Sequence, residues 1–392
     1  MKYPLASDTW GKEELAAIHR VVQSGRYTMG DEVKKFETEF AMQFGAKHAI
    51  MVNSGSSANL LMIGALFETG KLKKGDEVIV PAVSWSTTYF PLHQYGLKMV
   101  FVDVGDDWNM DPELVKKEIT SKTRVIFAVN LLGNPSKLDE LKAISQAYGL
   151  YLLEDNCESL GALVNSNNRY TGTFGLMGSF SFFFSHHIQT MEGGMILTDD
   201  DKLEQYCRAM RAHGWTRDLE DKNLIQFKTG NPFEDSFKFV VPGYCLRPLE
   251  MSGAIGQEQL KKMNGFIMGR IQNAMVFQRT IGQLPFVDIQ RENNTSSWFG
   301  FGIVLKGIME GRRDDLVNHL IASGVECRPI IAGNFMNQPV MDSFDRRMYK
   351  KTPTPMADRM DANGFFIGND AKDLEKEIEY AHNLIVDFSL KK

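Results

Sequence analysis

The chain has 392 residues, of which 43% are hydrophobic and 24% charged, and its formal net charge is −5. This length accommodates two or three domain-sized units with a large buried core, and the composition is ordinary for a globular protein. The acidic balance, with no run of five or more basic residues, argues against a nucleic-acid-binding protein.

The first segment, MKYPLASDTW, lacks the apolar stretch of a signal peptide, and no window approaches the roughly 18 consecutive apolar residues of a membrane span. We therefore expect a cytoplasmic protein without a membrane segment. The cysteines lie at least 38 residues apart, whereas zinc and many iron–sulfur sites use closely spaced ligands. We expect no metal site and four reduced thiols: Cys157, Cys207, Cys245 and Cys327.

The first 247 residues alternate helical patterns with short apolar runs. Residues 13–22 place Leu15, Ile18 and Val22 at helical spacing. Further helices are predicted at 111–119 and 137–149, and strands at 48–52, 77–80, 99–104, 124–129 and 151–155. Strands this apolar are covered by helices on both faces, which predicts an α/β domain around a mostly parallel sheet. Ligands of such sheets bind beyond the carboxyl ends of the strands.

The pattern changes after VPGY (241–244). Residues 248 to about 283 predict one long helix, and a strand at 298–305, a helix at 314–324 and a strand at 325–331 follow. We therefore divide the chain into a large domain, 1–247, and a smaller α+β domain, 248–392, which the long helix joins to it. No linker of low complexity separates them, so we expect a broad interface.

One candidate phosphate site follows the first predicted strand, where NSGSSANL (53–60) opens a helix. Gly55 allows a close backbone approach, and the amides of Ser56 and Ser57 at a helix N-terminus suit a phosphate group. A strand, a Gly/Ser turn and a helix also form a common structural connection, so this motif alone leaves both interpretations open.

Three more residues are candidates because of where they stand. Asp155 ends a predicted strand, although a carboxylate there is usually solvated or caps a helix. Trp85 follows another strand and could equally be a core or rim aromatic. Ser181 sits in an apolar strand, where structural hydrogen bonding is the ordinary role.

The order of these features, followed by F-S-F at 180–182 and E-G-G at 192–194, resembles pyridoxal-phosphate enzymes of the aspartate aminotransferase fold, in particular their nucleotide-sugar branch. The likeness extends from SGRYTMGDEVKKFETEFA through PGYCLRPLEMSGAIGQEQL to ECRPI. It implies a fold type I transferase with a seven-stranded type of sheet between helices.

The resemblance also implies roles for individual residues. Gly55, Ser56 and Ser181 match the residues that cradle the cofactor phosphate, and Trp85 matches the aromatic that stacks on the pyridine ring. Asp155 matches the carboxylate that pairs with the pyridinium nitrogen and lets the ring accept electrons. A further match is Glu158, at a position that is often glutamine and that faces the ring.

His186 departs from the aminotransferase pattern, because it stands where those enzymes carry the lysine that bonds covalently to the cofactor. No lysine occurs between Lys142 and Lys202. The motif S-H-H-I at 185–188 is similar to that of the sugar 3-dehydratases, in which the histidine transfers protons. His187 is expected to point away and serve packing. Two structural histidines in an inactive relative are the alternative interpretation.

The resemblance implies an enzyme that removes the C3 hydroxyl of a 4-keto-6-deoxy sugar, with GDP-4-keto-6-deoxymannose the expected substrate. Pyridoxamine phosphate would be the working cofactor, glutamate would restore it, and a pKa of about 6.5 would let His186 transfer protons near neutral pH. The alternatives are a CDP-sugar 3-dehydratase with an iron–sulfur cluster, whose cysteine cluster is absent; a sugar 4-aminotransferase, whose lysine is absent; and a non-catalytic regulator.

Three residues near the predicted domain boundary and in the C-terminal part have less definite matches. Arg247 and Arg328 are candidates for contacts to a carboxylate or a sugar diphosphate, and they are as plausible as structural arginines. Cys245 stands where relatives carry an asparagine that reaches the cofactor phosphate of the neighbouring subunit, and a thiol is a much weaker hydrogen-bond partner. That position predicts a homodimer whose active sites use both subunits.

Overall fold

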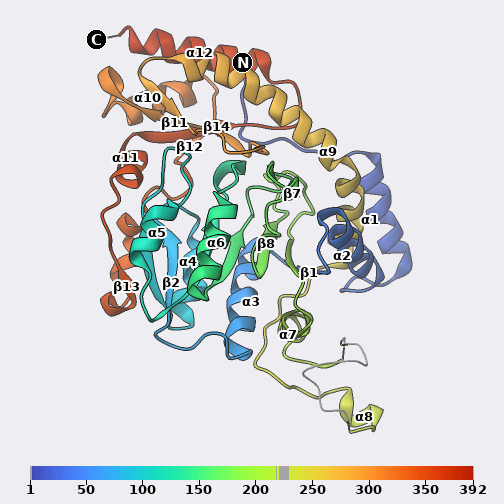
Figure 1. The fold of residues 1–392 in the computed structure, drawn as a ribbon. Coiled ribbons are helices and arrows are strands. Elements are labelled where there is room, and N and C mark those ends of the chain that lie inside the picture. The colour runs from blue at the N-terminus through green and yellow to red at the C-terminus, as the bar shows by residue number, and fades with distance from the viewer. Residues whose placement is uncertain (1, 218, 220–228, 392) are drawn as a thin grey trace.

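The computed structural model describes residues 2–217, 219 and 229–391. Its centre is an eight-stranded sheet of order β1-β9-β8-β5-β4-β2-β3-β13. Figure 1 labels β1, β8, β2 and β13 of this sheet. In the described part of the sheet, β9 alone runs in the opposite direction to the other strands. The strands are β1 (His48–Val52), β2 (Glu77–Pro81), β3 (Lys98–Val102), β4 (Thr123–Val129), β5 (Tyr151–Asp155), β8 (Met177–Ser181), β9 (Gly194–Thr198) and β13 (Tyr349–Lys350).

This architecture confirms the predicted α/β fold with a mostly parallel sheet. The predicted strands 48–52 and 151–155 coincide with β1 and β5, and the others differ by at most two residues at either end. The sheet has one strand more than the seven-stranded type that the resemblance implied, and the additional strand is β13 at its edge. β13 comes from the C-terminal part of the chain and pairs with Met99 and Val100, and a strand of two residues is too short for a periodic sequence signature.

Helices cover both faces of the large sheet. On one face lie α5 and α6, whose Val115 and Leu141 share a buried cluster with Ile79 of β2. On the other lie α3, α4 and α7, whose buried residues share a second cluster with Val78 and Val80. The alternation along β2 is the period of two that a strand imposes. These helices are α3 (Gly55–Glu68), α4 (Ser86–Gln94), α5 (Pro112–Glu118), α6 (Leu138–Tyr148) and α7 (Asp201–Arg211).

The N-terminal helices are α1 (Lys12–Ser24) and α2 (Asp31–Phe44), and both pack on the long helix α9 (Glu250–Arg279) (Figure 1). The helix predicted at 13–22 is present, but it turns Ala17 and Val21 inward and leaves Leu15 56% and Val22 47% exposed. Spacing alone indicated a face one residue further along, about 100° around the helix, because it could not show which side meets α9.

The C-terminal part forms a second, antiparallel sheet of order β10-β11-β14-β12. Its strands and flanking helices are β10 (Val287–Ile289), β11 (Gly300–Leu305), β12 (Cys327–Arg328), β14 (Gly364–Gly368), α10 (Arg313–Ala322) and α12 (Glu375–Ser389). The strand predicted at 325–331 was too long: it ends at Arg328, because Pro329 has no amide hydrogen for the ladder. The segment that follows returns to the large sheet, where Phe335, Met341 and Phe344 join its core. The domain division after residue 247 stays a prediction.

The remaining elements are short. They are the hairpin strands β6 (Leu163–Val164) and β7 (Arg169–Tyr170), the helices α8 (Pro232–Asp235) and α11 (Pro355–Asn363), and 3₁₀ turns at Leu131–Gly133, Ile281–Gln283, Gly307–Met309, Phe335–Asn337, Pro339–Ser343 and Arg346–Met348. Among the described residues, no helix combines the length and the apolar character that crossing a bilayer requires.

Candidate active site

A cavity of about 590 Å³ lies at the carboxyl ends of β5 and β8 and at the start of α3. Strand ends in an open α/β sheet are the expected place for a ligand. The structure brings eight of the ten predicted site residues to this cavity: Gly55, Ser56, Trp85, Asp155, Glu158, Ser181, His186 and Arg328. The other two, Cys245 and Arg247, lie outside the lining.

The start of α3 forms one end of the cavity. A Cβ atom on Gly55 would lie 2.7 Å from the Ser181 Cβ and 2.8 Å from the Cys157 Sγ, so a side chain there would require its neighbours to move. The hydroxyl of Ser54 caps the helix and accepts the Ser57 amide at 3.1 Å. Ser57 therefore does not offer its amide to a phosphate, contrary to the sequence-based interpretation. The first helical amides, those of Gly55 and Ser56, remain the candidates.

Asp155, the last residue of β5, is buried and fixed by three donors. The amide of Asn59 and the hydroxyl of Thr88 both donate to its Oδ2, each at 2.7 Å, and the backbone amide of Cys157 donates to Oδ1 at 3.3 Å. Sequence reasoning missed Asn59 and Thr88. A signal for Asn59 was present, since it is a polar residue within the apolar stretch ANLLMIGALF of α3.

Glu158 lines the cavity beside Asp155, and its Oε2 accepts the backbone amide of Leu132 at 2.9 Å. Burial, with a smaller contribution from the negative charge of Asp155, raises the pKa of Glu158 to about 8 against the opposing effect of the Leu132 amide. Glu158 is therefore mostly protonated at neutral pH. A protonated carboxyl offers one donor and one acceptor, as the amide of glutamine does.

His186 lies in the loop between β8 and β9 and faces the cavity. Its ring meets Phe299 edge-on, with centroids 5.1 Å apart, and its amide donates to the Phe183 carbonyl at 2.9 Å. Burial and the nearby positive charge of Arg270 lower the pKa of His186 to about 3. The value of about 6.5 assumed from the sequence was wrong, because the sequence does not show how far the ring is desolvated.

His187 is buried, is absent from the cavity lining, and has its Nε2 3.0 Å from the carbonyl oxygen of Ser297. Arg270 organises the same segment, because its Nη1 donates to the carbonyls of Trp298 at 3.3 Å and Phe299 at 3.0 Å. Burial, with the charge of Arg270, also holds the pKa of His187 well below its usual range. Of the two adjacent histidines, only His186 is placed to meet a ligand in the cavity.

The mouth of the cavity is aromatic and exposed. Trp85 precedes the first residue of α4 and is 57% exposed, and Phe183 beyond β8 is 44% exposed. Arg328 of β12 brings a solvent-exposed guanidinium to the same lining. Cys245 is also exposed, with its Sγ 3.7 Å from Nη2 of Arg247.

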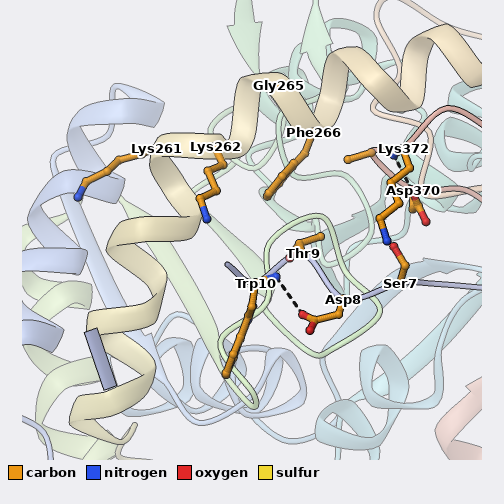
Figure 2. A pocket seen from close by; sticks show the side chains of 11 residues that line it. Ser7, Asp8, Thr9, Trp10, Lys261, Lys262, Gly265, Phe266, Asp370 and Lys372 are labelled. Carbon is orange, nitrogen blue, oxygen red and sulfur yellow. Dashed lines mark hydrogen bonds between the residues drawn. The ribbon is translucent and has the colours of Figure 1, made fainter. Parts of the chain in front are cut away.

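A second hollow of about 630 Å³ lies between residues 7–10, α9 and residues 370–372, and Trp10 and Phe266 project into it (Figure 2). None of the predicted site residues lines this hollow, so the chemistry is not placed there. Among the described residues, no group of three or more His, Cys, Asp or Glu side chains is arranged to hold a metal ion.

The sequence profile of the DegT/DnrJ/EryC1/StrS aminotransferase family matches residues 8–372. The chain belongs to this family. A relative in it, GDP-4-keto-6-deoxy-D-mannose 3-dehydratase of Yersinia pseudotuberculosis, is 51% identical over 390 residues, which cover 98% of each chain. The family assignment confirms the resemblance noted from the motifs.

Solved structures agree with this family membership. A crystal structure of GDP-4-keto-6-deoxymannose-3-dehydratase with bound GDP-perosamine has a TM-score of 0.94 and 51% identity, covering 98% of this chain and 100% of that one. Another structure of the same dehydratase contains a trapped PLP-glutamate geminal diamine, with the same TM-score of 0.94, 51% identity and coverage of 98% and 100%. Such likeness confirms the predicted aminotransferase fold and the pyridoxal-phosphate dependence of this DegT/DnrJ/EryC1/StrS member.

Proposed function

We propose that this protein is a pyridoxamine-phosphate-dependent 3-dehydratase that converts GDP-4-keto-6-deoxy-D-mannose into GDP-4-keto-3,6-dideoxy-D-mannose. The observation that carries the proposal is His186, which shares the cavity with Asp155 and Trp85, while no lysine of the described part of the chain lines it. Relatives that are 51% identical and are named for this reaction support the GDP-linked substrate. The product would serve the synthesis of a colitose-type dideoxysugar for a surface polysaccharide, in the cytoplasm.

The residues of the cavity fit the phosphorylated pyridine cofactor. The free amides at the start of α3 suit its phosphate, together with the hydroxyl of Ser181. Asp155 suits the ring nitrogen and Trp85 the ring face, with Glu158 as a neutral hydrogen-bonding group alongside. Pyridoxamine phosphate supplies an amine that condenses with a keto group and a ring that delocalises negative charge.

His186 is the proton-transferring residue in this proposal. Because its pKa is lowered to about 3, the imidazole is neutral at pH 7 and a weaker base than an exposed histidine, and it would accept the proton that the amine-bearing carbon of the cofactor loses. The same burial makes the protonated ring a strong acid, which favours release of the proton to the departing C3 hydroxyl. That group then leaves as water, and His186 returns to its neutral form.

Glutamate is the proposed amino donor, because each turnover consumes the amine of the cofactor and releases it as ammonia. The relative with a trapped PLP-glutamate adduct supports this choice. Arg328 at the cavity and Arg247 nearby are proposed to bind the donor carboxylate or the sugar diphosphate, since a guanidinium fork suits both anions.

We further propose a homodimer with shared active sites. Trp85 and Phe183 at the cavity are 57% and 44% exposed, Phe184 next in the chain is 50% exposed, and α1 exposes Leu15 and Val22. Apolar side chains gathered at a cavity mouth are typical of an interface. The exposed position of Cys245 is compatible with a role toward the partner subunit, as its place in the motif predicts.

The test is an incubation of the purified protein with pyridoxal phosphate, glutamate and GDP-4-keto-6-deoxymannose. We expect ammonia and 2-oxoglutarate in equal amounts over many turnovers, and no more than one equivalent of 2-oxoglutarate when the sugar is left out. Formation of GDP-perosamine without ammonia would instead identify an aminotransferase. Activity only with CDP-4-keto-6-deoxyglucose would identify the other dehydratase type, and absence of both products would indicate a non-catalytic protein.

A further inference from the structure

Asn59 is a buried polar residue in the second turn of α3, and only 1% of it is exposed. Its neighbours Ala58, Leu61 and Met62 are fully buried apolar residues. An amide in such surroundings is costly unless its hydrogen bonds are made. The Nδ2 of Asn59 meets this requirement by donating to Asp155 Oδ2 at 2.7 Å.

Ser179 of β8 satisfies the other end of that amide. Its hydroxyl, fully buried, donates to the Asn59 Oδ1 at 2.6 Å. A flipped amide would set its oxygen against the Asp155 carboxylate, where neither group can donate, so the carboxylate fixes the orientation of Asn59 and Ser179 completes its hydrogen bonds. The parallel register places Ser179 opposite Asp155 in the sheet, so helix, strand and carboxylate are joined in one chain of hydrogen bonds.

The consequence is an unequal division of donors between the two oxygens of Asp155. Oδ2 receives Asn59 and also the hydroxyl of Thr88, which is itself 2.7 Å from the Ser84 hydroxyl. Oδ1 receives the backbone amide of Cys157 at the longer distance of 3.3 Å, and the Cys157 thiol interacts with the same carboxylate. A carboxylate oxygen accepts about two hydrogen bonds, so Oδ1 keeps the capacity for one more donor.

We propose that Asn59, supported by the hydroxyl of Ser179, is a positioning residue that holds the Asp155 carboxylate with Oδ1 available to the protonated ring nitrogen of the cofactor. This inference rests on the proposed function, because it requires a pyridine ring in the cavity. Asn59 acts through Asp155 and touches neither the cofactor nor the sugar. A purely structural role, in which Asn59 only ties α3 to β5, is the alternative that the experiment must separate.

The experiment measures the dissociation constant of pyridoxamine phosphate for full-length variants, by equilibrium dialysis, between pH 5.5 and pH 8. Asn59→Leu should bind the cofactor about tenfold or more weakly at every pH, because a buried hydrogen bond to a charged group is lost. Ser179→Ala removes the donor to Asn59, together with weaker contacts to the Glu154 carbonyl and the Cys157 thiol, and should give a smaller loss. It also provides the test if Asn59→Leu does not fold.

Asn59→Asp supplies the readout that a structural role would not produce. The new carboxyl can donate to Asp155 only when the pair holds a proton, so the variant should bind weakly at pH 8 and approach wild type as the pH falls. Asn273→Leu is the matched control: Asn273 is equally buried, on α9, and donates to backbone carbonyls of residues 370 and 372. Its loss should lower thermal stability and leave cofactor affinity unchanged.

The outcomes are distinguishable. If wild type binds pyridoxamine phosphate and releases ammonia while Asn59→Leu and Ser179→Ala bind it equally well, the positioning role is wrong and the proposed function stands. A binding defect of Asn59→Asp that does not change with pH would also overturn it. If wild type itself fails to bind pyridoxamine phosphate, both the proposed function and this inference fall.

Discussion

Replacing Glu158 by glutamine should stabilise the cofactor-free protein, and the gain should grow with pH. Burial raises the pKa of Glu158 to about 8, against 4.5 for an ordinary glutamate. Between these values the folded state holds a proton that the unfolded chain has released, so the free energy of unfolding falls as the pH rises. Glu158→Gln removes this titration and keeps the shape of the protonated acid.

The size of the effect follows from the width of that window. Between the two pKa values, each pH unit adds up to about 1.4 kcal/mol to the difference in free energy of unfolding between the variant and wild type. From pH 5.5 to pH 7.5 this amounts to about 3 kcal/mol. The Glu158 side chain keeps partial contact with solvent, which screens its charge. We therefore expect the difference in free energy of unfolding to change by about 1 to 2 kcal/mol over this range. The gain should be smallest near pH 5, increase up to pH 8 and stay constant above it.

The assay is urea unfolding followed by tryptophan fluorescence, at fixed protein concentration and without cofactor, since a ligand would add its own stabilisation. Glu192→Gln is the control, because Glu192 lines the same cavity with a solvent-exposed side chain. Its difference from wild type should stay nearly constant with pH. A Glu158→Gln difference that is equally flat, or that shrinks toward pH 8, would refute the assignment of a protonated Glu158.

The other predictions concern the histidine pair and the assembly. His186→Lys should form a covalent bond to pyridoxal phosphate that borohydride traps and mass spectrometry locates, while dehydration falls about 10²- to 10⁴-fold because the acid–base group is lost. Wild type should show no cofactor fixed to the chain after borohydride; a labelled lysine would contradict the proposed role of His186. His186→Asn should lower ammonia release far more than His187→Asn, and the reverse order would assign the base to His187. Sedimentation at micromolar concentration should show a dimer, and a fully active monomer would exclude shared active sites.

The features that the sequence by itself determined are those with local signals. The strands at 48–52 and 151–155 could be placed because β-branched and apolar residues end at turn or polar residues, and the start of α3 could be placed because Gly55 follows a strand. His186 could be singled out because no lysine occurs between Lys142 and Lys202. These are properties of neighbouring residues, which the sequence contains directly.

Only the tertiary structure decided the chemistry of the individual groups. Asn59 and Asp155 are 96 residues apart, so nothing local predicts that one donates to the other. The pKa of Glu158 rises and that of His186 falls because each ring or carboxyl is packed away from water by segments distant in sequence. Desolvation and long-range hydrogen bonding depend on which elements meet in space, and the folded chain alone brings those elements together.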